Sequence, residues 1–104
     1  MDQINILLVC SAGMSTSMLV TKMKDAAESK GINAKIWAVG DAEAPRNIPD
    51  ADIVLLGPQV RYLQKKTQEM AGDKPVEVID MLLYGTMNGA KVLELALNKL
   101  EGKD

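Results

Sequence analysis

The chain has 104 residues, of which 47% are hydrophobic and 25% are charged, so it suits one soluble domain and is too short for two. Twelve basic and fourteen acidic residues give a formal net charge of -2, which argues against a nucleic-acid-binding protein. A single Cys excludes an internal disulfide, no His is present, no ligand-spaced metal cluster is seen, and the apolar runs are too short to cross a membrane. We therefore expect a cytoplasmic protein without direct membrane insertion.

The first part of the chain predicts a strand, a helix and a second strand. Residues 4–9 form a nearly continuous apolar run, typical of a central strand covered on both faces. Polar residues 15–17 are candidates for a helix N-cap, and apolar residues then recur at helical spacing until Gly31, which favours a helix end. Residues 32–38 alternate apolar and polar side chains, which predicts a half-exposed strand at a sheet edge.

The rest of the chain continues this alternation. Residues 41–50 contain two prolines and predict a loop with one helical turn. Residues 53–56 predict a second buried strand, which Gly57-Pro58 ends, and a helix follows as far as Gly72. The remaining predicted elements are a short strand over residues 76–79, an ambiguous apolar segment over 80–87, and a final helix from about Asn88 to Leu100.

This order of elements predicts an α/β fold with a four-stranded parallel sheet and helices on both faces, because crossovers between parallel strands are right-handed. Ligands of such sheets bind beyond the carboxyl ends of the strands, near the switch in strand order. We therefore expect three segments to meet at that edge. They are the segment that begins at Cys10, the turn Gly57-Pro58-Gln59, and residues 80–84.

The segment from Cys10 to Ser17 carries the predicted chemistry. Cys10 ends the first strand and precedes a turn of small, hydroxyl-rich residues. Small residues and Gly13 allow backbone amide groups to converge on one point, and the following helix adds positive charge at its amino end. These donors favour negative charge at the Cys10 sulfur and on a phosphoryl group bonded to it. The alternatives are a structural core Cys and hydroxyls that only cap the helix.

Other phosphate-binding loops require residues that this segment lacks. A Walker loop needs a Lys after its last Gly, and no Gly-Lys-Ser/Thr sequence occurs here. A dinucleotide fingerprint needs three spaced glycines, and the segment after Cys10 contains only Gly13. A Cys-dependent phosphatase, or a relative of the arsenate reductases, would carry an Arg clamp six residues after Cys10, where Thr16 stands. Without that Arg we expect slow hydrolysis and infer a phosphoryl carrier. A module that only senses phosphate is a third alternative, and it would retain function in the Cys10→Ser variant.

Three motifs resemble one known family. They are L-L-V-C-S-A-G-M-S-T-S at residues 7–17, V-L-L-G-P-Q at 54–59, and K-P-V-E-V-I-D-M-L-L-Y-G at 74–85. Together with the chain length they resemble the IIB component of the bacterial phosphoenolpyruvate:sugar phosphotransferase system, lactose/cellobiose class. The resemblance covers essentially the whole chain, residues 1–104, as one domain. Residues 37–50 carry none of its motifs.

The resemblance implies a protein-phosphocysteine–sugar phosphotransferase. A phosphohistidine on a IIA protein would donate a phosphoryl group to Cys10. Phospho-Cys10 would then donate it to a β-linked disaccharide, of cellobiose or chitobiose type, held by a membrane IIC protein. The family fold is a four-stranded parallel sheet with helices on both sides, and the resemblance implies no metal and no cofactor. We expect the chain to be a monomer.

The resemblance also implies roles for single residues. Phosphate binding, mainly through backbone amide groups, would fall to Ser11, Ala12, Gly13, Met14, Ser15, Thr16 and Ser17. Gln59, Asp80 and Tyr84 are weaker candidates for supporting the site or for docking a partner. Asp80 also suits a solvated carboxylate at a strand end, and Tyr84 suits packing. Met14 and Met18 suit either core packing or an apolar patch that the IIA and IIC partners contact.

Overall fold

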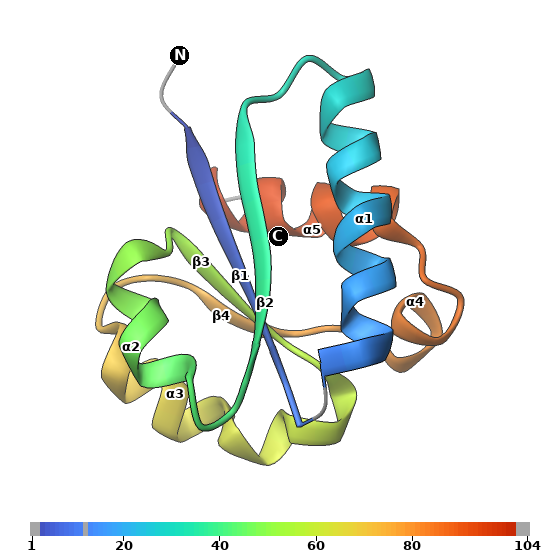
Figure 1. Cartoon of the computed structure of the whole chain (residues 1–104). Helices are drawn as coiled ribbons and strands as arrows, with labels where there is room; N and C mark the ends of the chain where they lie inside the picture. The colour runs from blue at the N-terminus through green and yellow to red at the C-terminus, as the bar shows by residue number, and fades with distance from the viewer. Residues whose placement is uncertain (1–2, 12, 102–104) are drawn as a thin grey trace.

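Four parallel strands form a sheet at the centre of the molecule (Figure 1). The structure is a computed structural model that describes residues 3–11 and 13–101, and for residues 13–16 it describes the backbone alone. The strands lie in the order β2-β1-β3-β4, so the prediction of a four-stranded parallel sheet is confirmed. Their bounds are β1 Ile4–Cys10, β2 Ala34–Gly40, β3 Ile53–Leu56 and β4 Val76–Val78. The strand predicted at an edge is β2, which begins two residues later than expected.

Helices and short helical turns connect the strands. Their bounds are α1 Gly13–Ser29, α2 Ala44–Asn47, η1 Ile48–Asp50, η2 Pro58–Leu63, α3 Gln64–Ala71, α4 Met81–Gly85 and α5 Gly89–Leu100. The predicted helix stops hold, because Gly31 and Gly72 adopt positive φ angles of 70° and 68°. The prediction of one continuous helix as far as Gly72 is wrong, since the segment begins as the 3-10 helix η2, which is kinked at Val60 (φ -118°, ψ 23°), and α3 begins only at Gln64. Val60 is fully buried and β-branched, and its packing outweighs the weak helical preference of this segment.

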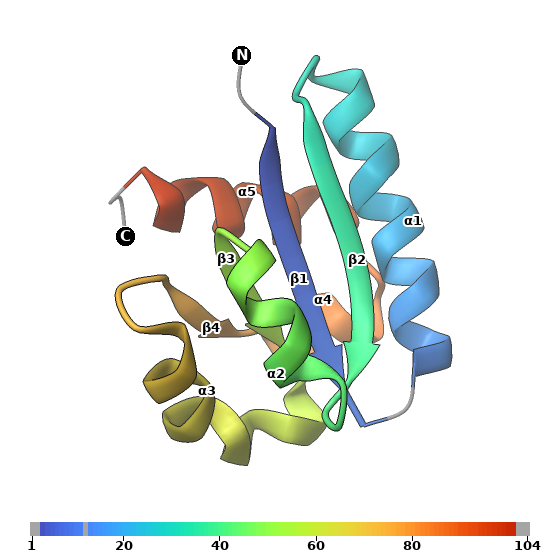
Figure 2. The same cartoon turned by 60° about the vertical axis from the view of Figure 1, so that its left-hand side comes forward.

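The direction of each crossover decides which face of the sheet a helix covers. The chain moves from β1 outward to β2 and then returns past β1 to reach β3 and β4. Because crossovers between parallel strands are right-handed, this reversal places α1 on one face and α2 and α3 on the other. Figure 2 shows this arrangement, with α5 returning to the face that α1 covers. The switch in strand order therefore lies between β1 and β3.

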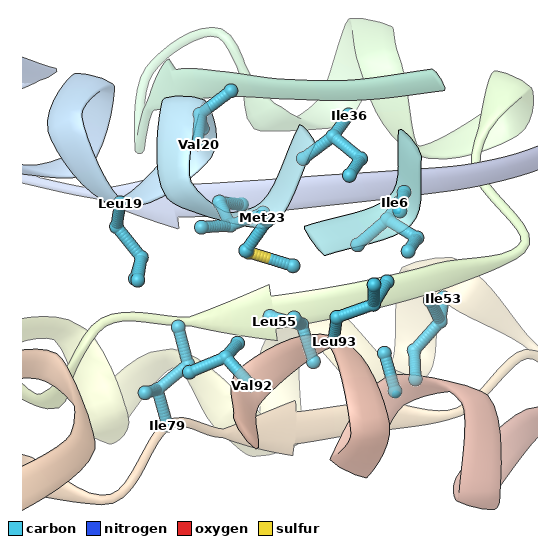
Figure 3. Packing of buried hydrophobic residues seen from close by; sticks show 13 residues of the cluster. Ile6, Leu19, Val20, Met23, Ile36, Ile53, Leu55, Ile79, Val92 and Leu93 are labelled. Carbon is cyan, nitrogen blue, oxygen red and sulfur yellow. The ribbon is translucent and has the colours of Figure 1, made fainter. Parts of the chain in front are cut away.

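Two hydrophobic clusters flank the sheet, one on each face. Side chains alternate along β1 and β3, so Ile6, Leu8 and Leu55 pack towards α1 and α5, as Figure 3 shows for part of this cluster. Leu7 and Val54 pack on the opposite face, with α2 and α3. Both central strands are therefore apolar on two faces, which explains their continuous apolar sequence.

Close packing of α1 on α5 requires a glycine, and this gives a first prediction. A Cβ atom added at Gly89 would lie 2.5 Å from Lys22 backbone and side-chain carbons and 2.6 Å from the Met23 amide nitrogen. We expect Gly89→Ala to lower the free energy of unfolding by about 1–3 kcal/mol, because the backbone of α1 must move to make room. Thermal and denaturant unfolding measure this change.

Gly85→Ala is the matched control, since a Cβ there would meet nothing within 4 Å. Its stability should equal or slightly exceed that of the parent chain. Equal stability of the two variants would contradict the packing argument.

Candidate functional site

Cys10 is the last residue of β1, and its side chain is almost fully buried. It continues the alternation of Ile6 and Leu8, so it faces the side of the sheet that α1 covers. On one side it pairs in register with Gly40 of β2, and on the other side the β3 strand has already ended one register position earlier, opposite Val9. The sulfur therefore sits at the carboxyl edge of the sheet, at the switch in strand order.

The chain passes from β1 to α1 through only two residues, because α1 begins at Gly13. The sequence predicted a longer loop, with residues 15–17 as helix caps. This prediction is wrong, because residues 15–17 already belong to α1. Ser and Thr suit a first helical turn as well as a cap position, since their hydroxyls bond to nearby backbone groups in both places. The short connection brings the amino end of α1 next to the end of β1.

The helical start changes which amide groups point out of α1. A helix leaves its first amide groups without an intrahelical acceptor, and here these include the amides of Gly13, Met14 and Ser15. The amide of Ser17 lies further in, where it bonds four residues back along the helix. Ser11 is exposed. Ala12 and the side chains of residues 13–16 lie outside what the structure describes, and with them the predictions for the Met14 side chain and for the hydroxyls of Ser15 and Thr16.

The second predicted segment does meet Cys10. The Gly57 amide donates to the Val9 carbonyl oxygen at 2.8 Å, which ties the end of β3 to the end of β1. A Cβ atom added at Gly57 would lie 3.5 Å from the Cys10 Cβ and 2.8 Å from the Gln59 Oε1. Gln59 is exposed overall, yet its carboxamide folds back over Gly57 towards Cys10.

The third predicted segment lies one strand further away. The Ile79 amide donates to the Leu56 carbonyl oxygen at 2.8 Å, so Asp80 follows beside Gly57, with β3 between it and β1. The Asp80 carboxylate accepts bonds from the amides of Leu82 at 2.8 Å and Leu83 at 3.3 Å. Asp80 is therefore the N-cap of α4 rather than only a solvated carboxylate.

Two features of this edge escaped the sequence analysis. Gly57 was predicted to end a strand and to belong to a turn at this edge, but not to make room for the Gln59 carboxamide through its missing side chain. The apolar segment at Met81 and Leu82 was ambiguous, and the structure exposes 70% and 71% of these two residues on α4. Tyr84 of the same helix is half-buried and packs against the core. A strand followed directly by Gly-Pro-Gln was the available signal for the first feature.

Two general properties of the site concern ligands and membranes. Within residues 3–11 and 13–101, no three His, Cys, Asp or Glu side chains gather as ligands for a metal ion. None of the helices in this part of the chain is both long enough and apolar enough to span a membrane.

Comparison with known proteins finds relatives in one bacterial transport system. The oligo-β-mannoside-specific EIIB component of the phosphotransferase system from Bacillus subtilis is 52% identical over 95 residues, covering 89% of this chain and 92% of that protein. The cellobiose-specific EIIB component from Lactococcus lactis subsp. lactis is 45% identical over 101 residues, covering 89% and 93%.

A solved structure and a family model agree with these relatives. The solution structure of a cellobiose-specific IIB component from Borrelia burgdorferi superposes with a TM-score of 0.80 at 47% identity, covering 99% of this chain and 96% of that one. The family model described as "PTS system, Lactose/Cellobiose specific IIB subunit" matches residues 5–95. The chain therefore belongs to the lactose/cellobiose-specific IIB family of the phosphotransferase system, whose members relay phosphoryl groups during sugar uptake.

Proposed function

We propose that Cys10 is the residue that carries the phosphoryl group. The observation that supports this most is the position of its side chain, at the end of β1 and on the side of the sheet where α1 begins. The amide groups at the start of α1 and the positive end of its dipole favour an anion there. Cys10 is also the only thiol of the chain, which has no His.

The proposed cycle has two transfer steps. In the first, the Cys10 thiolate attacks the phosphorus of a phosphohistidine on a IIA protein. The S–P bond forms as the N–P bond breaks, and the imidazole nitrogen keeps the electron pair of the broken bond. In the second, a sugar hydroxyl held by a membrane IIC protein attacks the phosphorus. The O–P bond forms as the S–P bond breaks, the thiolate returns, and the hydroxyl proton passes to a base in the acceptor complex.

The composition of the segment after Cys10 supports a carrier rather than a hydrolase. No Arg or Lys occurs among residues 11–17, so this segment offers a bound phosphoryl group only neutral donors and the helix dipole. Thr16 occupies the position of the Arg clamp in Cys-dependent phosphatases. We expect the thiophosphate to persist until an acceptor arrives.

The sugar is proposed from the relatives. The names of two relatives specify oligo-β-mannosides and cellobiose, which share β-linked sugars. We propose a β-linked disaccharide as the acceptor, phosphorylated in the cytoplasm. The chain would act as a monomer between its IIA and IIC partners.

A docking surface for the IIA donor is proposed around the same edge. Within the described residues, five large hydrophobic side chains are exposed. Four of them lie on elements that begin at the carboxyl edge of the sheet, and they are Met18 of α1, Tyr62 of η2, and Met81 and Leu82 of α4. Exposed apolar residues gathered around a reactive group are typical of a protein-docking site. The fifth, Met70, belongs to α3 on the other face.

Mass spectrometry tests the central claim. Incubation with phosphoenolpyruvate, the general relay proteins and IIA should add one phosphoryl group, located on Cys10 by fragmentation, and should protect the thiol from alkylation. Cys10→Ser should form no thiophosphate and lose essentially all transfer to sugar, while its fold remains intact by circular dichroism. An adduct at another residue, or none, would sink the proposal.

The docking surface gives its own prediction. The double variant Met81→Ser/Leu82→Ser should reduce kcat/KM for transfer from phospho-IIA about tenfold, because two exposed apolar contacts are lost. Stability should change little, since both side chains already face solvent. Met70→Ser, also an exposed Met but on α3, is the control and should transfer as the parent chain does. Equal rates for the two variants would remove α4 from the docking surface.

The capping role of Asp80 can be separated from a chemical role. Asp80→Ala removes the acceptor of two α4 amides and should lower the free energy of unfolding by about 1 kcal/mol. Asp80→Asn keeps a capping oxygen and should retain both stability and transfer. Loss of transfer in Asp80→Asn at unchanged stability would instead assign the negative charge of Asp80 to the chemistry or to partner binding.

A further inference from the structure

We infer that Gln59 is a direct phosphoryl ligand, and that its side-chain Nε2 group donates a hydrogen bond to a phosphoryl oxygen carried on Cys10. This inference rests on the proposed function of Cys10 and adds to it a donor from a second strand end. Gln59 follows β3, whereas Cys10 ends β1 and α1 begins shortly after it, at Gly13. The phosphoryl group would then be held from two sides.

The position of the carboxamide carries the argument. The site where a Gly57 Cβ would stand is 2.8 Å from the Gln59 Oε1 and 3.5 Å from the Cys10 Cβ. The carboxamide and the Cys10 side chain therefore border the same small space, which exists because residue 57 has no side chain. The atom nearest this space is the acceptor Oε1, and a half-turn of the terminal carboxamide puts the donor Nε2 in its place. A phosphoryl oxygen on Cys10 lies three bonds beyond the Cβ (Cβ–Sγ, Sγ–P and P–O), a reach on the scale of the space that separates the two side chains.

The donor capacity of Gln59 differs from that of two other glutamines. The Gln64 Nε2 donates to the Val76 carbonyl oxygen, and the Gln68 Nε2 donates to two backbone carbonyl oxygens at 3.0 and 2.8 Å. Within the described residues, the Gln59 carboxamide makes no such bond. Its two N–H donors thus remain available at the mouth of the site, where the side chain is exposed.

The carboxamide is neutral, and this suits a carrier. A hydrogen bond to a charged phosphoryl oxygen orients the group and favours its binding without adding the positive charge of an Arg clamp. Gln59 would fix the phosphorus for in-line attack and leave most of the negative charge in place to discourage attack by stray hydroxide.

Paired variants test this role by rates. Gln59→Ala should slow phosphorylation of Cys10 by phospho-IIA roughly 10- to 100-fold, the range for a lost hydrogen bond to a charged group. Gln59→Glu keeps the shape but turns the donor into an anion, and its loss should be larger. Gln3→Glu adds the same charge at an exposed position just before β1, at the opposite edge of the sheet, and should react as the parent chain does.

A third variant uses Gly57. Its backbone angles (φ -62°, ψ 154°) accept an alanine, and the new Cβ would displace the Gln59 carboxamide while making only ordinary contact with Cys10. Gly57→Ala should therefore reproduce the loss seen in Gln59→Ala. The double variant should lose no more than either single variant, because both remove one interaction. Additive losses would overturn the inference.

Nuclear magnetic resonance distinguishes a phosphoryl ligand from a docking residue. In ¹⁵N-labelled protein whose mass confirms the Cys10 adduct, the side-chain amide signals of Gln59 should shift on phosphorylation, while those of Gln64 and Gln68 stay in place. An adduct with unmoved Gln59 signals overturns the inference, even if Gln59→Ala slows transfer, and leaves the proposed function standing. Absence of any adduct on Cys10 overturns both.

Discussion

Strand β1 has a neighbour on each edge and a helical layer on each face, and the rest of the site depends on this placement. Its side chains must alternate between two apolar clusters, so the face on which Cys10 lies is set by the same alternation that buries Ile6 and Leu8. A shift of one residue in register would turn Cys10 towards α3. It would also move every β1 side chain into the hydrophobic cluster on the opposite face, where it does not fit. The large apolar area buried by β1 thus fixes the position of one reactive atom.

The reversal of the chain direction supplies the second half of the site. After β2 the chain returns to the other side of β1, which brings the end of β3 beside Val9 and Cys10. The bond from the Gly57 amide to the Val9 carbonyl oxygen holds this junction at the atomic level. Since no strand blocks the edge beyond this junction, residues that follow β3 can fold back over Cys10. Gln59 does so only because Gly57 leaves the space empty.

The spacing of apolar residues predicted most of the fold, because it matches the burial of each strand. The two central strands are continuously apolar, and β2 alternates at its start because one of its faces is less covered there, which leaves Lys35 exposed beside buried Ile36. The start of α1 was predicted too late, since Ser15 and Thr16 suit a cap and a first helical turn equally well. The α4 helix was ambiguous because Met81 and Leu82 are apolar yet exposed, which periodicity cannot distinguish from burial. The approach of Gln59 to Cys10 is tertiary and has no local pattern.

The difference between carrying and hydrolysing a phosphoryl group comes down to the charge around the phosphorus. In the proposed site, backbone amides, a helix dipole and a carboxamide would bind the phosphoryl oxygens while keeping the group anionic, so solvent hydroxide would still be repelled. An Arg would neutralise the equatorial oxygens and lower the barrier for water as well as for the intended acceptor. Under the proposed function, a carrier without that positive charge would hold its phosphoryl group until an acceptor is docked. The neutral segment from Ser11 to Ser17 and the exposed apolar residues around it are two parts of this arrangement. In this proposal the neutral segment retains the phosphoryl group, and the exposed apolar residues bind the donor protein.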